Sequence, residues 1–430
     1  MTNLVPRLRP LIVLSFLAMV GGGCSASAVD DQSRGQTTSA STDRSSLSTA
    51  VDPSFQNWVD ELRNQAIREG VSPNTFDQAF ERVRPLDRVI ELDRSQPEFT
   101  LSFWRYMSNA VNDRRIEEGR DLLQQHRPLL SEVEQRYGVQ PRFLVAFWGL
   151  ETNYGATFGN FPVISSLATL AYDERRSAFF REELLHALKI LDSGDISPER
   201  MEGSWAGAMG HLQFMPSTYT AYATDADGDS RRDIWGSMPD VFASAANFLS
   251  SIGWRGDQTW GQEVRLPANF DWSLVSIETM PETLKTIDEW KALGLHGADG
   301  ATLPSDNREA AVILPAGSEG PAFLVYHNYT RILQWNRSIL YAVAVGYLAD
   351  KLVGGPDLTV SAPQEDVRLS VDQVKDMQSR LGRLGFNAGP ADGKVGPMTR
   401  TAIRDYQESR GLPADAFPSR KLLRQIRSEE

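Results

Sequence analysis

The stretch PRFLVAFWGLETNYG, residues 141–155, places a single glutamate among apolar side chains. Pro141 suits the first turn of a helix, because its missing N–H is not needed there, and Gly155 suits the residue at which a helix ends. Within such a helix, Glu151 shares a face with the residues three, four and seven positions before it, all of which are apolar. The sequence therefore predicts a carboxyl group on the inward face of a helix.

A carboxyl group in that position has a chemical consequence. Burial disfavours the charged form and raises the pKa, so we expect Glu151 to hold a proton near neutral pH and to act as a proton donor. The alternative is a structural glutamate that turns to solvent at the helix end or pairs with a buried arginine. The residues that follow, 152–163, contain amide and hydroxyl groups, two glycines and three aromatics, a mixture typical of a sugar-binding site.

Composition limits both the architecture and the partners. The chain has 430 residues, of which 41% are hydrophobic, enough for one large core and a smaller second domain. Its net charge of -12 and its pI near 5.1 would repel a polyanion, and no basic cluster with interleaved aromatics offsets that charge. We therefore expect no nucleic-acid partner.

The N-terminal residues have the features of an export signal. Arg7 and Arg9 precede an apolar run, 11–20, which suits a signal-peptide core and is too short to cross a bilayer as a mature helix. Cys24, the only cysteine, follows three glycines and resembles the lipidated cysteine of a bacterial lipobox. This resemblance implies a protein of the Gram-negative periplasm, anchored to the outer membrane through Cys24. Cleavage at the A-x-A sequence 26–28 is the alternative and would leave a soluble periplasmic form.

Changes in composition divide the chain into five segments. A Ser/Thr-rich sequence with few large apolar residues cannot form a core. Apolar residues three and four positions apart predict helices, and a stretch of Pro, Gly and polar residues predicts a linker. We predict a signal peptide with the lipobox (1–24), a disordered tether (25–51), a large helical domain (52–355), a linker (356–368) and a small module (369–428).

Two smaller patterns remain open at the level of sequence. The apolar segments 308–316 and 321–327 are short enough to be strands or buried connectors, and we leave them unassigned. In the small module, Pro397 can start a second helix after a Gly-rich turn. The sequence PADAF at 413–417 echoes PADGK at 390–394, which indicates an internal half-repeat.

Three motifs, in series, resemble the membrane-bound lytic transglycosylase B family. Residues 151–155 match the pattern E-[ST]-x-[FY]-G, and GSWAGAMGHLQFMPSTY at 203–219 is similar to the family signature G-x-x-G-x-x-Q-F. NYTRILQWNRSILYAVAVGYLAD at 328–350 resembles the late family motif that precedes a final core helix. The resemblance implies a mainly α fold, with a lysozyme-like helical catalytic domain and a small three-helix peptidoglycan-binding domain.

The resemblance also implies a reaction. Glu151 would be the lone catalytic acid and base, which protonates the glycosidic oxygen between N-acetylmuramic acid and N-acetylglucosamine in peptidoglycan glycan strands. The same carboxylate would then take the proton of the muramoyl C6 hydroxyl, giving a 1,6-anhydro product without water and without a required cofactor. Ordinary glycosidases use two carboxylates. The alternatives are a hydrolytic muramidase and a non-catalytic scaffold, and we expect a monomer.

Further residues are assigned to the substrate from the same motifs. Amide, hydroxyl and aromatic groups can bond or stack on saccharides, although several of them could simply pack the core, and the glycine-rich element could be a turn between helices. His211 has no role known to us in the family, and we expect an exposed loop histidine. The predicted substrate-binding residues are Tyr154, Ser204, Gln213, Tyr326, Asn328, Tyr329, Trp335 and Asn336.

An aspartate-rich segment, DADGDSRRDIWGSMPD at 225–240, has the oxygen spacing of a calcium loop. It departs from the EF-hand pattern, because Ser230 stands in place of glycine and Gly236 in place of the bidentate glutamate. The neighbouring arginines could neutralise the aspartates instead. The candidate ligands of a structural calcium ion are Asp225, Asp227, Asp229, Asp233 and Asp240.

The small module resembles the peptidoglycan-binding type 1 domain. The resemblance rests on a D-G-x-x-G turn formed by Asp392, Gly393 and Gly396, and it covers nearly the whole module. It implies that the module holds the enzyme on a polymeric wall, which raises the local substrate concentration. A small helical bundle without a ligand is the alternative.

Overall fold

The computed structural model describes residues 53–95, 101–276, 281, 283–363 and 367–429. The predicted signal peptide with Cys24 and the predicted tether lie outside the described residues. Within the described ranges, no helix combines the length and the apolar character needed to cross a membrane.

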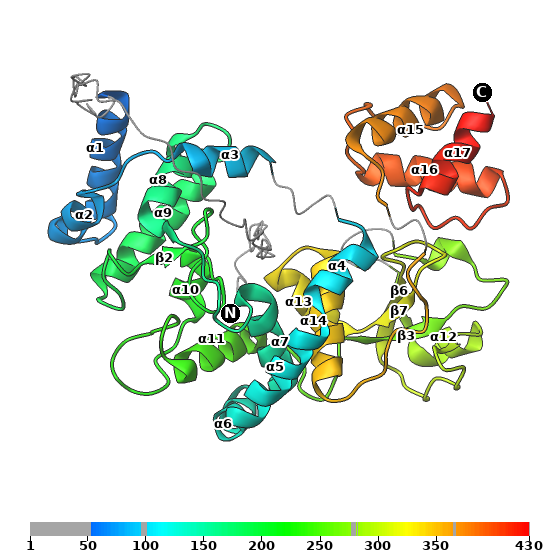
Figure 1. Ribbon diagram of the computed structural model, residues 1–430, viewed down its shortest axis with the longest axis horizontal. Helices are drawn as coiled ribbons and strands as arrows, with labels where there is room; N and C mark the ends of the chain where they lie inside the picture. Colours follow the sequence, from blue (N-terminus) through cyan, green and yellow to red (C-terminus); the bar gives the residue numbers. More distant parts are fainter. Residues whose placement is uncertain (1–52, 96–100, 277–280, 282, 364–366, 430) are drawn as a thin grey trace, which may run out of the picture.

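Helices dominate the first part of the chain, which confirms the expected mainly α fold (Figure 1). The helices of this part are α1 (Pro53–Arg68), α2 (Pro73–Phe80), α3 (Asp87–Ser95), α4 (Phe103–Ala110), α5 (Asp113–Gln125), α6 (Arg127–Tyr137), α7 (Pro141–Thr152), α8 (Val163–Tyr172), α9 (Ser177–Asp192), α10 (Pro216–Tyr222), α11 (Met238–Ser251), α12 (Ile287–Ala292), α13 (His327–Trp335) and α14 (Ile339–Leu352).

Helix α7 lies at the centre of this bundle and packs against α5, α6, α11 and α14. Every residue from Phe143 to Thr152 is buried, so the helix has no solvent face, as its almost wholly apolar sequence requires. The helix ends at Thr152, three residues before the predicted end. Asn153, Tyr154 and Gly155 all have a left-handed backbone, with φ of 50°, 59° and 85°, so non-glycine residues begin the turn.

The two unassigned apolar segments are strands of a five-stranded sheet with the order β4-β6-β7-β3-β5. Its strands pair antiparallel, with Ala311 opposite Val325 and Val264 opposite Ala322. Successive residues of β6 and β7 face two different cores, one shared with the helices and one under α12, which explains their continuous apolar sequence. The strands are β3 (Gly261–Arg265), β4 (Lys285–Thr286), β5 (His296–Gly297), β6 (Glu309–Ile313) and β7 (Ala322–Val325).

Two short elements complete the large domain. Strands β1 (Phe161–Pro162) and β2 (Glu202–Gly203) pair antiparallel and join the segment after α7 to the glycine-rich motif. A 3₁₀ turn, η2 (Trp272–Leu274), lies between β3 and β4.

The terminal module is a three-helix unit with its own core, and it lies above the sheet at the upper right of Figure 1. Its helices are α15 (Val371–Arg383), α16 (Pro397–Ser409) and α17 (Arg420–Ser428). Pro397 begins α16, as predicted. Arg404 donates a hydrogen bond to the carbonyl oxygen of Val275 at 3.1 Å, which links the module to the large domain.

Candidate active site

Glu151 lies in the last turn of α7 and is only 6% exposed. Its Oε1 accepts a hydrogen bond from Nε1 of Trp335 at 2.9 Å and a second one from the hydroxyl of Tyr341. The Trp335 ring stacks on Phe147, one turn before the glutamate, with 4.3 Å between ring centroids. The carboxyl group on α7 is therefore fixed by Trp335 at the end of α13 and by Tyr341 at the start of α14.

Burial raises the pKa of the Glu151 carboxyl to about 7, although the hydrogen bonds from Tyr341 and Trp335 act in the opposite direction. Loss of water disfavours the charged form, and here this effect exceeds the stabilisation of the carboxylate by its two donors. A carboxyl group with a pKa near neutrality can both donate and accept a proton at neutral pH. The direction of this shift agrees with the raised Glu151 pKa that the sequence predicts.

Two tyrosines that the sequence analysis does not predict lie at this carboxyl group. Tyr341 lies within the third motif without being one of the predicted site residues, and Tyr106 comes from α4, outside all three motifs. Burial and the neighbouring Glu151 charge both raise the pKa of Tyr106 and of Tyr341, so both hydroxyls stay protonated. Among the described residues, the buried Tyr106 hydroxyl has no hydrogen-bond partner.

His211 is not the exposed loop residue that we expected. It is half-buried, its ring meets Phe158 edge-on, and its Nδ1 accepts a hydrogen bond from Nε1 of Trp148 at 2.7 Å. Its carbonyl oxygen accepts a bond from the Thr152 hydroxyl at 3.1 Å. Burial lowers the pKa of His211 to about 4, so the ring is neutral and can serve as this acceptor. His211 thus holds two side chains of α7 on either side of Glu151.

The glycine-rich motif forms a tight turn that meets protein atoms closely. A Cβ at Gly207 would lie 2.4 Å from Leu167 Cδ2, and one at Gly210 would lie 2.6 Å from the carbonyl oxygen of Ile234. Ser204 Oγ accepts a hydrogen bond from the Ala208 N–H. These contacts require the small residues for packing, whatever their role toward a ligand.

Gln213 and Tyr154 are both held by backbone groups. Gln213 has a left-handed backbone, with φ of 48°, and its amide nitrogen donates to the carbonyl oxygens of Phe158 and Gly210. The Tyr154 hydroxyl donates to the Arg115 carbonyl oxygen at 2.8 Å. The contacts of Tyr154 turn it toward α5, whereas Gln213 fixes the loop that follows α7.

The predicted residues of the third motif divide into two groups. Trp335 touches Glu151, and the buried Asn336 follows it directly. The side-chain amide of Asn328 forms hydrogen bonds with the loop 255–258. Its oxygen accepts from Arg255 N, and its nitrogen donates to the carbonyl oxygens of Arg255 and Gln258. The remaining two side chains, those of Tyr326 and Tyr329, are buried in the sheet core and the helical core. For these three, the structure favours the packing alternative over a saccharide-lining role.

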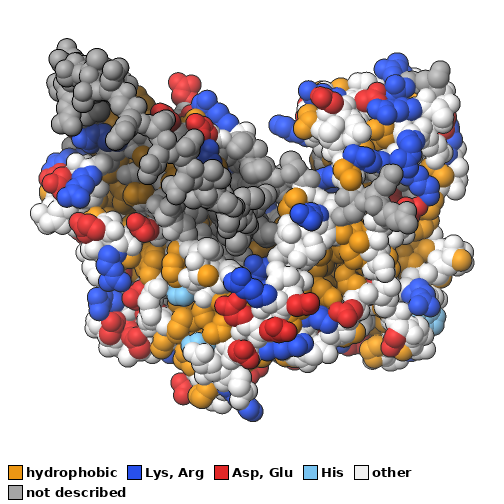
Figure 2. All heavy atoms as spheres, viewed as in Figure 1, with side chains coloured by type: hydrophobic (Ala, Val, Ile, Leu, Met, Phe, Trp, Pro, Cys, Tyr) orange, Lys and Arg blue, Asp and Glu red, His pale blue; other side chains and the backbone are white. Residues whose placement is uncertain are grey.

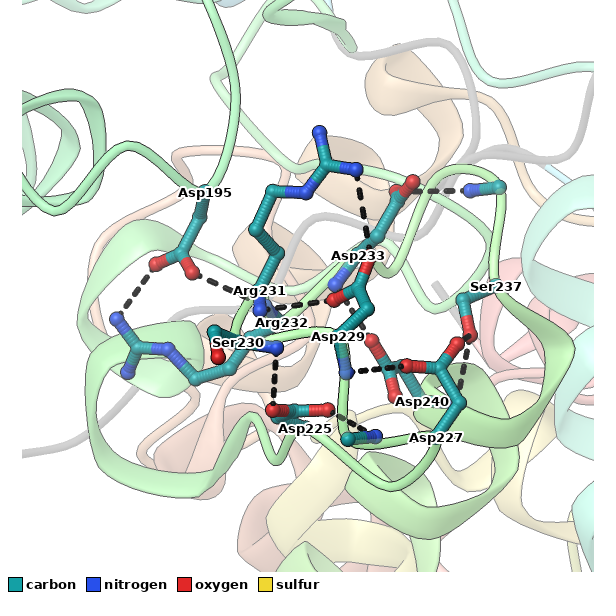
Figure 3. A network of polar contacts seen from close by, with 12 residues as sticks. Asp195, Asp225, Asp227, Asp229, Ser230, Arg231, Arg232, Asp233, Ser237 and Asp240 are labelled. Carbon is teal, nitrogen blue, oxygen red and sulfur yellow. Dashed lines mark hydrogen bonds and ion pairs between the residues drawn. The ribbon is translucent and has the colours of Figure 1, made fainter.

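The aspartate loop brings three of the five candidate ligands together (Figure 3). Carboxylate oxygens of Asp225, Asp227 and Asp229 lie within 4.8 Å of one another. Calcium binds oxygens at about 2.3–2.6 Å, so this separation fits a shared ion. Arg231 pairs with Asp229 at 3.3 Å, and Arg232 pairs with Asp195 outside the loop at 2.6 Å. The arginines therefore neutralise only part of the cluster.

Asp233 and Asp240 have other partners. The fully buried Asp240 accepts hydrogen bonds from Ala226 N and Asp233 N, each at 2.7 Å, which ties the two sides of the loop together. Asp233 accepts from Trp235 N and Gly236 N. The structure does not bring these two carboxylates into the cluster that Asp225, Asp227 and Asp229 form.

Comparison with known proteins follows the same division of the chain. Residues 54–350 match the family described as the transglycosylase SLT domain, and residues 370–426 match a peptidoglycan binding domain family. The chain is 29% identical over 316 residues to the membrane-bound lytic murein transglycosylase B of Escherichia coli strain K12, covering 70% of this chain and 82% of that protein.

Two solved structures are similar over most of their length. SltB3 from Pseudomonas aeruginosa, in complex with NAG-NAM-pentapeptide, is 47% identical, with a TM-score of 0.83 over 87% of this chain and 100% of that one. The lytic transglycosylase Slt35 of Escherichia coli, in complex with calcium, is 26% identical, with a TM-score of 0.59 over 70% and 93% of the two chains. The large domain thus has the lysozyme-like helical fold that the motifs implied, and the protein belongs to the transglycosylase SLT family.

Proposed function

We propose that the protein is a peptidoglycan lytic transglycosylase that cleaves the bond between N-acetylmuramic acid and N-acetylglucosamine, with Glu151 as acid and base. The observation that carries this proposal is the buried Glu151 carboxyl group, held by two donors and given a pKa of about 7. Among the described residues, no second carboxylate contributes to that pKa. A site with one carboxylate needs a nucleophile from the substrate itself.

The reaction balances with this one group. Both hydrogen bonds to Glu151 end on Oε1, which leaves Oε2 to carry the proton. Oε2 gives that proton to the glycosidic oxygen, and the C1–O bond breaks. The carboxylate then accepts the proton of the C6 hydroxyl while O6 bonds to C1, which restores the acid and releases a 1,6-anhydromuramoyl product.

Digestion of purified sacculi tests this proposal. Glu151→Gln should abolish the release of soluble fragments while the protein still binds sacculi, because the amide cannot donate or take the proton. Mass spectrometry of fragments released by the unchanged protein should give products lighter by one water than hydrolytic fragments. Reducing-end products would instead identify a muramidase. Full release by the Glu151→Gln variant would refute Glu151 as the catalytic acid and base, and no release by the unchanged protein would favour the scaffold alternative.

We also propose that the protein works in the periplasm as a monomer, anchored to the outer membrane through Cys24. The support is the N-terminal sequence pattern and the membrane-bound relative. Cys24→Ala should move the protein from the membrane to the soluble fraction of a fractionated cell. Retention of this variant in the membrane would refute the anchor, and light scattering of the soluble form tests the monomer.

A structural calcium ion at the aspartate loop is a further proposal. Asp225, Asp227 and Asp229 would hold it, and its charge would relieve the repulsion of three clustered carboxylates. Calcium chloride should then raise the melting temperature, by mass action on the folded state. The variant Asp227→Asn should lose most of this increase. An equal increase in both proteins would show that calcium acts elsewhere.

A further inference from the structure

The terminal module contains the same turn twice, in agreement with the half-repeat indicated by its sequence. The first turn, 390–394, leads from α15 into α16, and the second turn, 413–417, leads from α16 into α17. A residue with a left-handed backbone follows the aspartate in both, Gly393 with φ of 80° and Ala416 with φ of 57°. The two turns are therefore alike in position and backbone as well as in sequence.

The same hydrogen bonds hold both turns. In the first, Asp392 Oδ1 accepts from Gln378 Nε2 at 3.2 Å and from Lys394 N at 2.8 Å, and Gln378 Oε1 accepts from Gly393 N at 2.9 Å. In the second, Asp415 Oδ1 accepts from Gln407 Nε2 at 2.7 Å and from the N–H two residues later at 2.9 Å. Gln407 Oε1 accepts the N–H of Ala416 at 2.9 Å.

In the second turn, the other carboxylate oxygen already has a peptide partner. Asp415 Oδ2 accepts a hydrogen bond from Ser318 N at 2.7 Å, in the loop between β6 and β7 of the large domain. Next to it, Gly317 lies against the Phe417 ring so closely that a Cβ would be 2.9 Å from Cδ1. Lys421 pairs with the Glu319 carboxylate at 2.6 Å. This turn, together with Lys421 at the start of α17, thus holds a short segment that offers an N–H, a small residue and a carboxylate.

In the first turn, the equivalent oxygen is available. Among the described residues, Asp392 Oδ2 receives no hydrogen bond, and Asp392 lies at the surface. Two exposed apolar side chains flank the turn: Val371, 58% exposed, touches Gly393, and Met398, 50% exposed, touches Gly389. The Lys394 side chain is also exposed. An acceptor for an N–H, exposed apolar side chains and a cation are therefore all found at or beside this turn.

We propose that the turn 390–394 binds the acidic stem peptide of peptidoglycan, in the way that the turn 413–417 holds residues 317–319. Asp392 accepts a backbone N–H of the stem peptide, Lys394 pairs with one of its carboxylates, and a small apolar side chain packs between Val371 and Met398. This inference rests on the proposed action on peptidoglycan, and it names the part of the polymer that the module recognises.

The charge of the module supports an acidic peptide over a neutral glycan. Residues 369–428 contain eleven Lys or Arg and six Asp or Glu, although the whole chain has a net charge of -12. Figure 2 shows Lys and Arg side chains gathered on the module at its upper right. An excess of positive charge attracts carboxylates and leaves an uncharged sugar unaffected. The peptide segment in the second turn favours the same choice.

The test uses the full chain carrying Glu151→Gln, so that sacculi stay intact during binding. Binding is measured to sacculi by sedimentation, and to the free stem tetrapeptide and a peptide-free glycan by calorimetry. Asp392→Asn keeps an oxygen for the turn but removes the second acceptor, and Lys394→Glu changes only an exposed side chain. Asp405→Asn, an exposed aspartate on α16, is the matched control.

We expect Asp392→Asn and Lys394→Glu each to weaken binding to sacculi and to the tetrapeptide at least about tenfold, as loss of a hydrogen bond to a charged group implies. The control should bind within about twofold of the parent, and glycan binding should not change. Parent-like peptide binding by both variants would overturn the proposal, as would an equal loss for the glycan. Failure of the parent itself to bind sacculi would refute wall binding as such.

Discussion

Replacing Tyr341 by phenylalanine should raise the pKa of Glu151 further. The substitution removes one hydroxyl and leaves the ring that packs near Phe147. The Tyr341 hydroxyl donates to Glu151 Oε1, which stabilises the carboxylate and lowers its pKa against the larger effect of burial. Without this donor, the charged form keeps only the bond from Trp335.

The size of the effect follows from the strength of such a bond. A hydrogen bond to a charged group contributes about 1.5–3 kcal/mol, and about 1.4 kcal/mol corresponds to one pH unit in a pKa. The pKa of about 7 should therefore rise by about one unit or more. Cleavage needs the protonated acid, so activity should extend to higher pH in the variant.

The assay is the release of anhydro fragments from sacculi between pH 5 and pH 10. In the unchanged protein, kcat/KM should fall with a midpoint near pH 7, and in Tyr341→Phe the midpoint should move up by about one unit. The control is Tyr347→Phe on the same helix, whose hydroxyl lies 3.5 Å from Asp357. A midpoint that stays in place or moves down in Tyr341→Phe would refute our account of how the Glu151 pKa is set.

Three other predictions concern stability and docking. Because the folded pKa of Glu151 is raised, its stabilising contribution is complete below the unfolded value of 4.5 and is lost as the pH rises to about 7. In urea unfolding, the free energy of unfolding of the parent should therefore fall by about 3 kcal/mol relative to that of Glu151→Gln between pH 4 and pH 8. His211→Phe should lower the unfolding free energy by about 1–3 kcal/mol, because Trp148 Nε1 loses its acceptor, and His211→Gln should lower it less. Asp415→Asn should speed proteolysis of the protein within 356–368, because it weakens the contact between the module and the sheet. The activity of the variant on soluble glycan fragments should not change.

The local part of the site could be predicted from sequence, and the distant part could not. Helical periodicity places Glu151 among apolar residues of its own helix, and this requires only neighbours within two turns. The donors that fix the carboxyl group, Trp335 and Tyr341, lie 184 and 190 residues away in the chain. No periodic pattern reports such pairings, and only the family motif pointed to Trp335.

Other differences have equally specific causes. The strands β6 and β7 could not be recognised, because both of their faces are buried and the alternation that marks a strand is absent. Helix α7 ends three residues before the predicted Gly155, because Asn153 and Tyr154 already adopt the left-handed conformation that glycine adopts most readily. Asn328 resembled a ligand-binding amide, but its partners are backbone groups of a loop about seventy residues earlier.

A single carboxyl group can serve two opposite steps only under conditions that this site meets. Its pKa must lie near the working pH, because a stronger acid would be ionised before the first step and a weaker one would hold its proton too firmly. Both proton transfers must also use an oxygen that faces the substrate. Trp335 and Tyr341 donate to Oε1, so in the mechanism that we propose Oε2 gives up the proton and takes the next one back. In that proposed mechanism, the two donors select the oxygen that reacts, and burial sets the pH range in which the carboxyl group is protonated.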